Sequence, residues 1–142
     1  MFRSTGTLHY EMANTAPPYK LVLLVDPDLA TYYFTSIPKS VRARRQAFAA
    51  HVSVVRKEAP LHAAAWGKYE GEVVEFWYEH NVRQDNVYLW LDAYSTRLEE
   101  LRTELGLHNA PLYPATYHTP MPEGYPFKKR FHITLGNTKE VV

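Results

Sequence analysis

Cysteine is absent from this chain of 142 residues, which excludes disulfide bonds, thiolate catalysis and cysteine-ligated zinc sites. Long apolar runs are also absent, since none approaches the roughly 18–20 residues that a membrane-spanning helix needs. Residues 1–10 lack the apolar segment of a secretory signal peptide. From these absences we expect a cytoplasmic protein that does not act at a membrane.

Charge of one sign is not in excess, because 16 basic and 15 acidic residues leave a formal net charge of +1. A general binder of polyanions would carry a large positive charge, so any attraction for nucleic acid must come from local clusters. Hydrophobic residues make up 46% of the chain, which is enough for a packed core. We therefore expect residues 1–142 to form a single globular domain.

The pattern of apolar residues predicts an α+β fold. Strands are expected at 5–12, 19–25, 51–56, 69–78, 86–92 and 131–136. Helices are expected at 27–36, 40–49 and 95–105. A polar turn is expected at 79–85, and the five prolines between 109 and 129 indicate a long surface loop. The order strand–helix–strand occurs twice, over 21–55 and 87–135, and indicates an internal repeat.

The closing strand of each repeat begins with the same motif, a histidine followed two positions later by a hydroxyl residue. The two copies are His51-Val52-Ser53-Val54 and His132-Ile133-Thr134-Leu135. Of the seven histidines, only these two have serine or threonine at that spacing. Residues two apart in a strand point to the same face, so each motif puts an imidazole and a hydroxyl together and its apolar residues on the other face.

Two such strands side by side would place two imidazoles and two hydroxyls around one concavity. A neutral imidazole can take a proton from a nucleophile while an imidazolium protonates the leaving oxygen. An unperturbed histidine pKa of about 6.5 allows both forms near neutral pH. The hydroxyls of Ser53 and Thr134 can donate hydrogen bonds to phosphoryl oxygens, where negative charge develops. The motifs therefore predict phosphodiester cleavage with His51 and His132 as the acid–base pair, without a metal or cofactor.

The paired motifs, the repeat and the chain length together resemble the 2H phosphoesterase superfamily, which includes the LigT-like RNA 2′,3′-cyclic phosphodiesterases. The resemblance covers about residues 19–137. It implies a bilobed fold with a pseudo-two-fold axis, in which two antiparallel-sheet lobes with outer helices enclose a central groove. The first-motif lobe would span about 19–60 and the second-motif lobe about 86–137.

The same resemblance implies catalytic roles for His51 and His132 and phosphate binding by Ser53 and Thr134. Members of this superfamily act on 2′,3′-cyclic phosphates, 2′–5′ linkages and RNA 3′ ends. Some viral members act on cyclic oligonucleotide immune signals. The implied substrate is therefore a nucleotide or short oligonucleotide, and no obligate protein partner is evident.

Further residues could contact such a substrate. Arg56 directly follows the first motif strand, and Lys128 and Arg130 directly precede the second, so their charges could attract phosphate groups. The proline-rich segment carries Tyr117 and Tyr125, which could stack on a base as part of a lid. A solvated charged rim and a loop packed by its own aromatic residues are the alternatives for these two groups.

Two non-catalytic interpretations stay open: a module that holds a nucleotide without turnover, and an RNA-binding protein with a similar α+β topology. The second expects an aromatic-rich RNA-binding strand, which the sequence lacks. The first has no use for two titratable histidines in matching positions. Within the enzyme interpretation, the nucleophile is either water or a substrate 2′-hydroxyl, and either histidine could be the acid.

Overall fold

The structure of the protein is a computed structural model that describes residues 1–11, 19–109 and 124–139. Its strands are β1 (Phe2–Tyr10), β2 (Lys20–Leu24), β3 (Arg44–Arg45), β4 (His51–Arg56), β5 (Val73–Tyr78), β6 (Arg83–Asp85), β7 (Tyr88–Tyr94) and β8 (Phe131–Asn137). Its helices are α1 (Pro27–Thr35) and α2 (Thr96–Glu104), with 3-10 turns η1 (Lys39–Val41) and η2 (Ala63–Ala65). None of the helices in these described ranges is long and apolar enough to cross a membrane.

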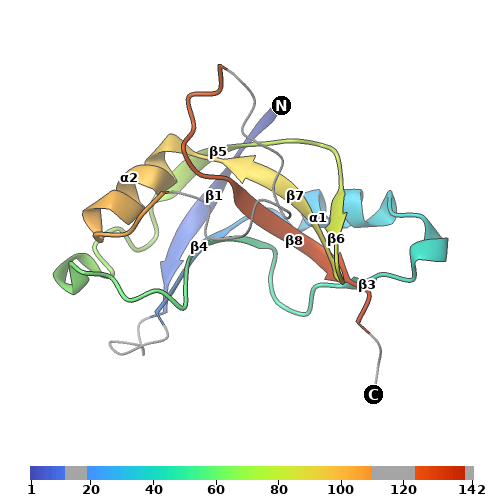
Figure 1. The fold of residues 1–142 in the computed structure, drawn as a ribbon, viewed down its shortest axis with the longest axis horizontal. Coiled ribbons are helices and arrows are strands. Elements are labelled where there is room, and N and C mark those ends of the chain that lie inside the picture. Colours follow the sequence, from blue (N-terminus) through green and yellow to red (C-terminus); the bar gives the residue numbers. More distant parts are fainter. Residues whose placement is uncertain (12–18, 110–123, 140–142) are drawn as a thin grey trace.

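Six antiparallel strands close into a barrel in the order β8-β4-β2-β1-β5-β7, because β7 also pairs with β8. The short strands β3 and β6 add to β8 and β7, respectively. The two helices lie on opposite sides of this barrel (Figure 1). The predicted α+β class is therefore confirmed, and the strands of both halves belong to one continuous sheet.

The expected repeat is visible in the connections of the barrel. In the first half β2 leads through α1 to β4, and in the second half β7 leads through α2 to β8. Within each half the two strands pair antiparallel, and β4 pairs antiparallel with β8 where the halves meet. The strand order β2-β4-β8-β7 is thus the same when read from either side, with the local two-fold axis between β4 and β8.

Local sequence signals explain where both helices begin. The Asp26 side chain accepts a hydrogen bond from the backbone of Asp28 at 2.9 Å, and Pro27 occupies the first turn of α1. The Ser95 hydroxyl accepts in the same way from the backbone of Leu98 and starts α2. Gly106, with φ of 79°, follows the end of α2 and adopts the left-handed conformation that terminates helices.

Two local predictions were wrong. The helix expected at 40–49 is replaced by η1 and β3, because Arg42 takes a left-handed conformation and the backbone of Arg44–Arg45 pairs with the edge of β8. The turn expected at 79–85 contains β6, which forms a tight hairpin with β7 through Asn86 at φ of 53°. Pairing with a distant strand decided the first segment, and a local hairpin decided the second.

A buried ion pair connects the first motif strand to the second helix. Arg102 of α2 is fully buried and donates to the carbonyl of Val54 at 2.7 Å and to both carboxylate oxygens of Glu58 at 2.8 Å. Burial opposes the charge on Glu58, but the hydrogen bond and the charge of Arg102 lower the pKa of its carboxyl overall. This contact holds the end of β4 against α2 and so fixes the direction of the motif strand.

The core predicts a clear difference between two leucines. Leu101 in α2 is 1% exposed inside the hydrophobic core, whereas Leu61 is 81% exposed. We expect Leu101→Ala to lower the free energy of unfolding by about 2–5 kcal/mol, because it removes buried methyl groups and leaves a cavity. Leu61→Ala, the matched control, should change it by less than about 0.5 kcal/mol. Urea unfolding measures both; equal losses would contradict the packing of α2.

Candidate functional site

The two motif strands are neighbours in the barrel and meet at Val52 and Ile133, which lie opposite each other. Both residues are fully buried. One residue outward along this antiparallel register, His51 lies opposite Thr134 and Ser53 opposite His132. All four are partly exposed, so they share the face that points away from the core. The fold therefore brings together the four residues that the motifs singled out.

Sheet geometry sets the scale of this arrangement. Opposite residues of an antiparallel pair have Cβ atoms about 4.5–5.5 Å apart, and diagonal neighbours are about 7–8 Å apart. Each imidazole thus has the hydroxyl of the other motif beside it, and the two imidazoles form a diagonal. A phosphate group placed over this square would have a histidine on two sides and a hydroxyl on the other two.

The chain holds His51 through its Nδ1 atom. This atom lies 2.6 Å from the carbonyl oxygen of Ala49, which can only accept, so Nδ1 carries the proton. Ala49 belongs to residues 47–50, which bulge out between β3 and β4, and the carbonyl of the adjacent Ala50 is fixed by the backbone N–H of Val25. In the neutral ring, Nε2 of His51 therefore keeps the lone pair that a base needs.

His132 has a different environment, built by β7. The indole ring of Trp90 lies on its ring with a centroid distance of 5.0 Å. The Oδ1 atom of Asp92, which is opposite His132 in the register, is 3.9 Å from its Nε2 atom. That Nε2 atom is buried, although the side chain as a whole is 28% exposed.

Asp92 is 2% exposed and is surrounded by polar groups. Its Oδ1 accepts a hydrogen bond from Nε1 of Trp90 at 2.9 Å. Its Oδ2 lies 3.3 Å from Nη1 of Arg83 in β6 and 3.7 Å from Nε of Arg130. Two guanidinium groups therefore lie close to this buried carboxylate.

Positive charge gathers on the same face near Tyr88, which is 43% exposed at the start of β7. A hydrogen bond with Lys139 and the positive charges of Lys139, Arg56 and Lys57 lower the pKa of the Tyr88 hydroxyl. The charges of Arg56, at the end of β4, and of the adjacent Lys57 therefore both reach Tyr88.

An exposed aromatic residue precedes the first motif strand. Phe48, in the bulge that precedes β4, is 68% exposed. The Nζ atom of Lys20 lies 5.2 Å from the centre of its ring, which is cation–π distance. Lys20 is on β2 beside β4, so an aromatic ring and a cation lie next to the first motif strand.

The four other predicted substrate contacts have different environments. Lys128 is exposed, and its backbone N–H donates to Glu99 at 2.9 Å. Arg130 is 9% exposed, and its Nε donates to the hydroxyl of Tyr94 at 3.1 Å, so it lies beneath the site beside Asp92. Tyr125 donates its hydroxyl to Glu79 at 2.8 Å. Tyr117 lies outside the described residues.

Sequence reasoning missed Trp90, Asp92 and Arg83. The signal for the first two was present, because an aspartate and a tryptophan two apart in an apolar strand share one face. Their position opposite the second motif depends on the pairing of β7 with β8, which the sequence does not show. Arg83 was missed because its segment was predicted to be a turn.

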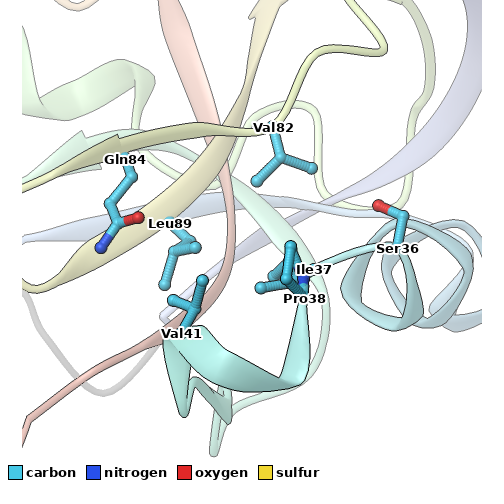
Figure 2. A pocket seen from close by; sticks show the side chains of 7 residues that line it. All are labelled: Ser36, Ile37, Pro38, Val41, Val82, Gln84 and Leu89. Atoms are coloured by element: carbon cyan, nitrogen blue, oxygen red, sulfur yellow. The ribbon is translucent and has the colours of Figure 1, made fainter.

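A small apolar cavity lies elsewhere. Figure 2 shows it between the chain that follows α1 and the β6–β7 hairpin. Its volume is about 150 Å³, and its lining is Ser36, Ile37, Pro38, Val41, Val82, Gln84 and Leu89. None of the motif residues lines it, and it is smaller than the roughly 300 Å³ of ordinary ligand pockets.

Comparison with known protein families, with curated proteins and with solved structures finds no match for this chain. In the part of the chain that the structure describes, no three histidine, aspartate or glutamate residues gather closely enough to hold a metal ion.

The buried Lys129 predicts a dependence of stability on pH. Burial, followed by the charge of Arg102, lowers the pKa of its amine from 10.5 to about 8. Between these values the unfolded chain binds more protons than the folded one, so this group makes the wild type more stable as pH rises. We expect the free energy of unfolding of wild type, relative to Lys129→Met, to increase from pH 8 to 10.5 in urea titrations.

Lys128→Met is the matched control, because its side chain is exposed and adjacent in sequence. Its difference from wild type should stay constant over the same range of pH. A constant difference for Lys129→Met as well would contradict the burial of its amine.

Proposed function

We propose that this protein is a metal-independent phosphodiesterase that cleaves a nucleotide or short oligonucleotide by acid–base catalysis with His51 and His132. The observation that carries the proposal is the register at Val52 and Ile133, which sets each histidine opposite the hydroxyl of the other motif. Two sequence motifs about 80 residues apart thereby form one compact site. The bilobed architecture with a central groove belongs to the same proposal, and the two-fold order β2-β4-β8-β7 supports it.

The geometry suits a phosphoryl group better than a carbonyl group. Phosphoryl transfer needs a base on the side of the nucleophile, an acid on the side of the leaving oxygen, and hydrogen-bond donors at the equatorial oxygens. The diagonal imidazoles provide the first two, and the hydroxyls of Ser53 and Thr134 provide donors between them. Water and a substrate 2′-hydroxyl can each act as the nucleophile in this frame.

The surroundings favour a nucleotide as the substrate. Arg56, Lys57 and Lys139 provide positive charge for phosphate groups close to Tyr88. Phe48, exposed beside the first motif strand, provides a surface on which a base can stack. Cations and an aromatic ring around a pair of imidazoles form the set that a phosphate, a sugar and a base require.

The alternative is a module that binds nucleotides without turnover. The same cations and aromatic rings would serve it, but it would not depend on the histidines as proton carriers. Substituting a histidine by alanine therefore separates the two functions, because a binding module keeps its affinity and an enzyme loses its rate.

We expect the purified protein in EDTA to turn over at least one substrate among 2′,3′-cyclic AMP, a 2′–5′ dinucleotide, cyclic dinucleotides and a short single-stranded RNA. His51→Ala and His132→Ala should each lower kcat by about 10²–10⁴-fold, since each removes a proton-transfer group. His80→Ala, an exposed histidine outside the motifs, is the control and should retain the activity. Product analysis by chromatography measures all four proteins.

Absence of turnover with every substrate, together with tight nucleotide binding that survives both alanine substitutions, would contradict the proposed enzymatic function. The protein would then be a binding module. Activity that EDTA abolishes would contradict the metal-independent mechanism.

The positive charges of Arg56 and Lys57 give a second prediction. Replacing Arg56 and Lys57 together by glutamine should raise KM by roughly tenfold at low ionic strength, because less positive charge attracts the substrate. The effect should shrink as salt is added, since ions screen exposed charges within about 10 Å at 0.1 M. Initial rates measured across a salt series test this. A change in kcat with KM unchanged would mean that these residues do not act by attraction.

A further inference from the structure

The local two-fold axis between β4 and β8 makes the two histidines equivalent in the backbone, but their neighbours differ. Leu24 of β2 lies opposite His51, and Asp92 of β7 lies opposite His132. Leu24 is an apolar residue 38% exposed, whereas Asp92 is an almost fully buried acid. At this pair of positions, a buried carboxyl group therefore breaks the symmetry of the site.

The next pair of equivalent positions breaks the symmetry in the same direction. Val22 lies opposite Ser53, and Trp90 lies opposite Thr134. The Trp90 ring lies on the ring of His132 and its indole N–H binds Asp92. An aromatic face attracts a cation, and so does a carboxylate, so both neighbours favour the protonated form of His132.

We propose that Asp92 is a positioning residue that keeps the shared proton on His132, so that His132 is the general acid and His51 is the general base. This inference rests on the proposed phosphodiesterase function and assigns the acid and base roles within it. A pair of imidazoles that works with one proton between them holds it on the ring nearer to negative charge. The Ala49 carbonyl, which orients His51, carries no net charge and leaves Nε2 of that ring as the base.

Other charged and titratable groups face Asp92 from every neighbouring element. Arg83 of β6 and Arg130, which directly precedes β8, both approach Oδ2, whereas His132 faces Oδ1. The backbone N–H of Glu79 donates to the carbonyl of Asp92, and the Glu79 carboxylate is held by Tyr125. Tyr94 binds Arg130. The arginines approach one oxygen of the carboxylate, and the other oxygen accepts from the Trp90 N–H and faces His132.

The proposed step transfers one proton at each end. Nε2 of His51 takes the proton from the attacking hydroxyl as that oxygen forms a new bond to phosphorus. The leaving oxygen departs with the electron pair of the broken P–O bond and takes a proton from His132. Since Nε2 of His132 is buried toward Asp92, the proton is transferred from the second ring nitrogen. Exchange with water then returns both rings to their starting states.

Asp92→Asn tests the inference without relying on activity. The substitution keeps an oxygen for the Trp90 N–H and removes the charge. In NMR titrations of histidine side-chain signals, we expect the titration midpoint of His132 to fall by roughly one pH unit or more, because an opposite charge is lost. The midpoint of His51 should stay where it is in wild type. An unchanged midpoint for His132 in a folded variant overturns the role of Asp92 even if the protein is an active phosphodiesterase.

A substrate with a good leaving group separates the acid from the base. Cleavage of uridine 3′-(4-nitrophenyl phosphate) expels nitrophenolate, which needs no protonation, but attack by the 2′-hydroxyl still needs a base. We expect His132→Ala and Asp92→Asn to keep rates within about tenfold of wild type on this substrate, and His51→Ala to lose about 10²-fold or more. On a cyclic or natural phosphodiester, all three variants should be slow.

Three outcomes remain distinct. A loss in His132→Ala with activity retained in His51→Ala reverses the two roles and overturns the inference. In wild type, the pKa of the general acid determines the alkaline limb of the pH profile of kcat/KM. Asp92→Asn should therefore move the alkaline limb to lower pH. Movement of the acidic limb instead would also overturn the inference. Absence of turnover by wild type on every phosphodiester would contradict the proposed function. The NMR titration would still test whether Asp92 favours the protonated form of His132.

Discussion

The contact between β4 and β8 is the constraint on which the site depends. Two strands from distant parts of the chain pair at Val52 and Ile133, whose side chains are fully buried in the barrel. Burial of a large apolar side chain contributes about 1.5–3 kcal/mol, and a slip by one residue would turn it out to water. The apolar halves of the motifs therefore fix the register, and the register places the imidazoles and hydroxyls on the opposite face.

The surrounding fold holds that contact in place from both directions. Arg102 fastens the end of β4 to α2 through Val54 and Glu58, and the pairing of β7 with β8 closes the barrel on the other side. A closed barrel has no free edge at these strands, so relative sliding would break hydrogen bonds on both sides. The partly exposed side chains thus rest on a rigid framework, which is the condition for preorganised catalysis.

The two halves of the barrel differ in what they place beside their histidines. The first half provides a backbone carbonyl and apolar neighbours, and the second provides a buried carboxylate that accepts a hydrogen bond from an indole N–H. A symmetric frame with asymmetric electrostatics is well suited to a reaction in which one group must accept a proton and the other must donate one. In the proposed mechanism, the different roles of the two histidines would follow mainly from the residues opposite them in β2 and β7.

The sequence by itself determined the α+β class, the positions of both α-helices, the two motif strands and the shared face of each His and hydroxyl pair. These features depend on periodicity and on residues within a few positions of one another, which local patterns record. It could not determine that β4 and β8 are neighbours, that Asp92 and Arg83 lie beside His132, or that Arg44–Arg45 forms a strand. Those features depend on pairing between distant segments, and only the tertiary structure decides which edges meet.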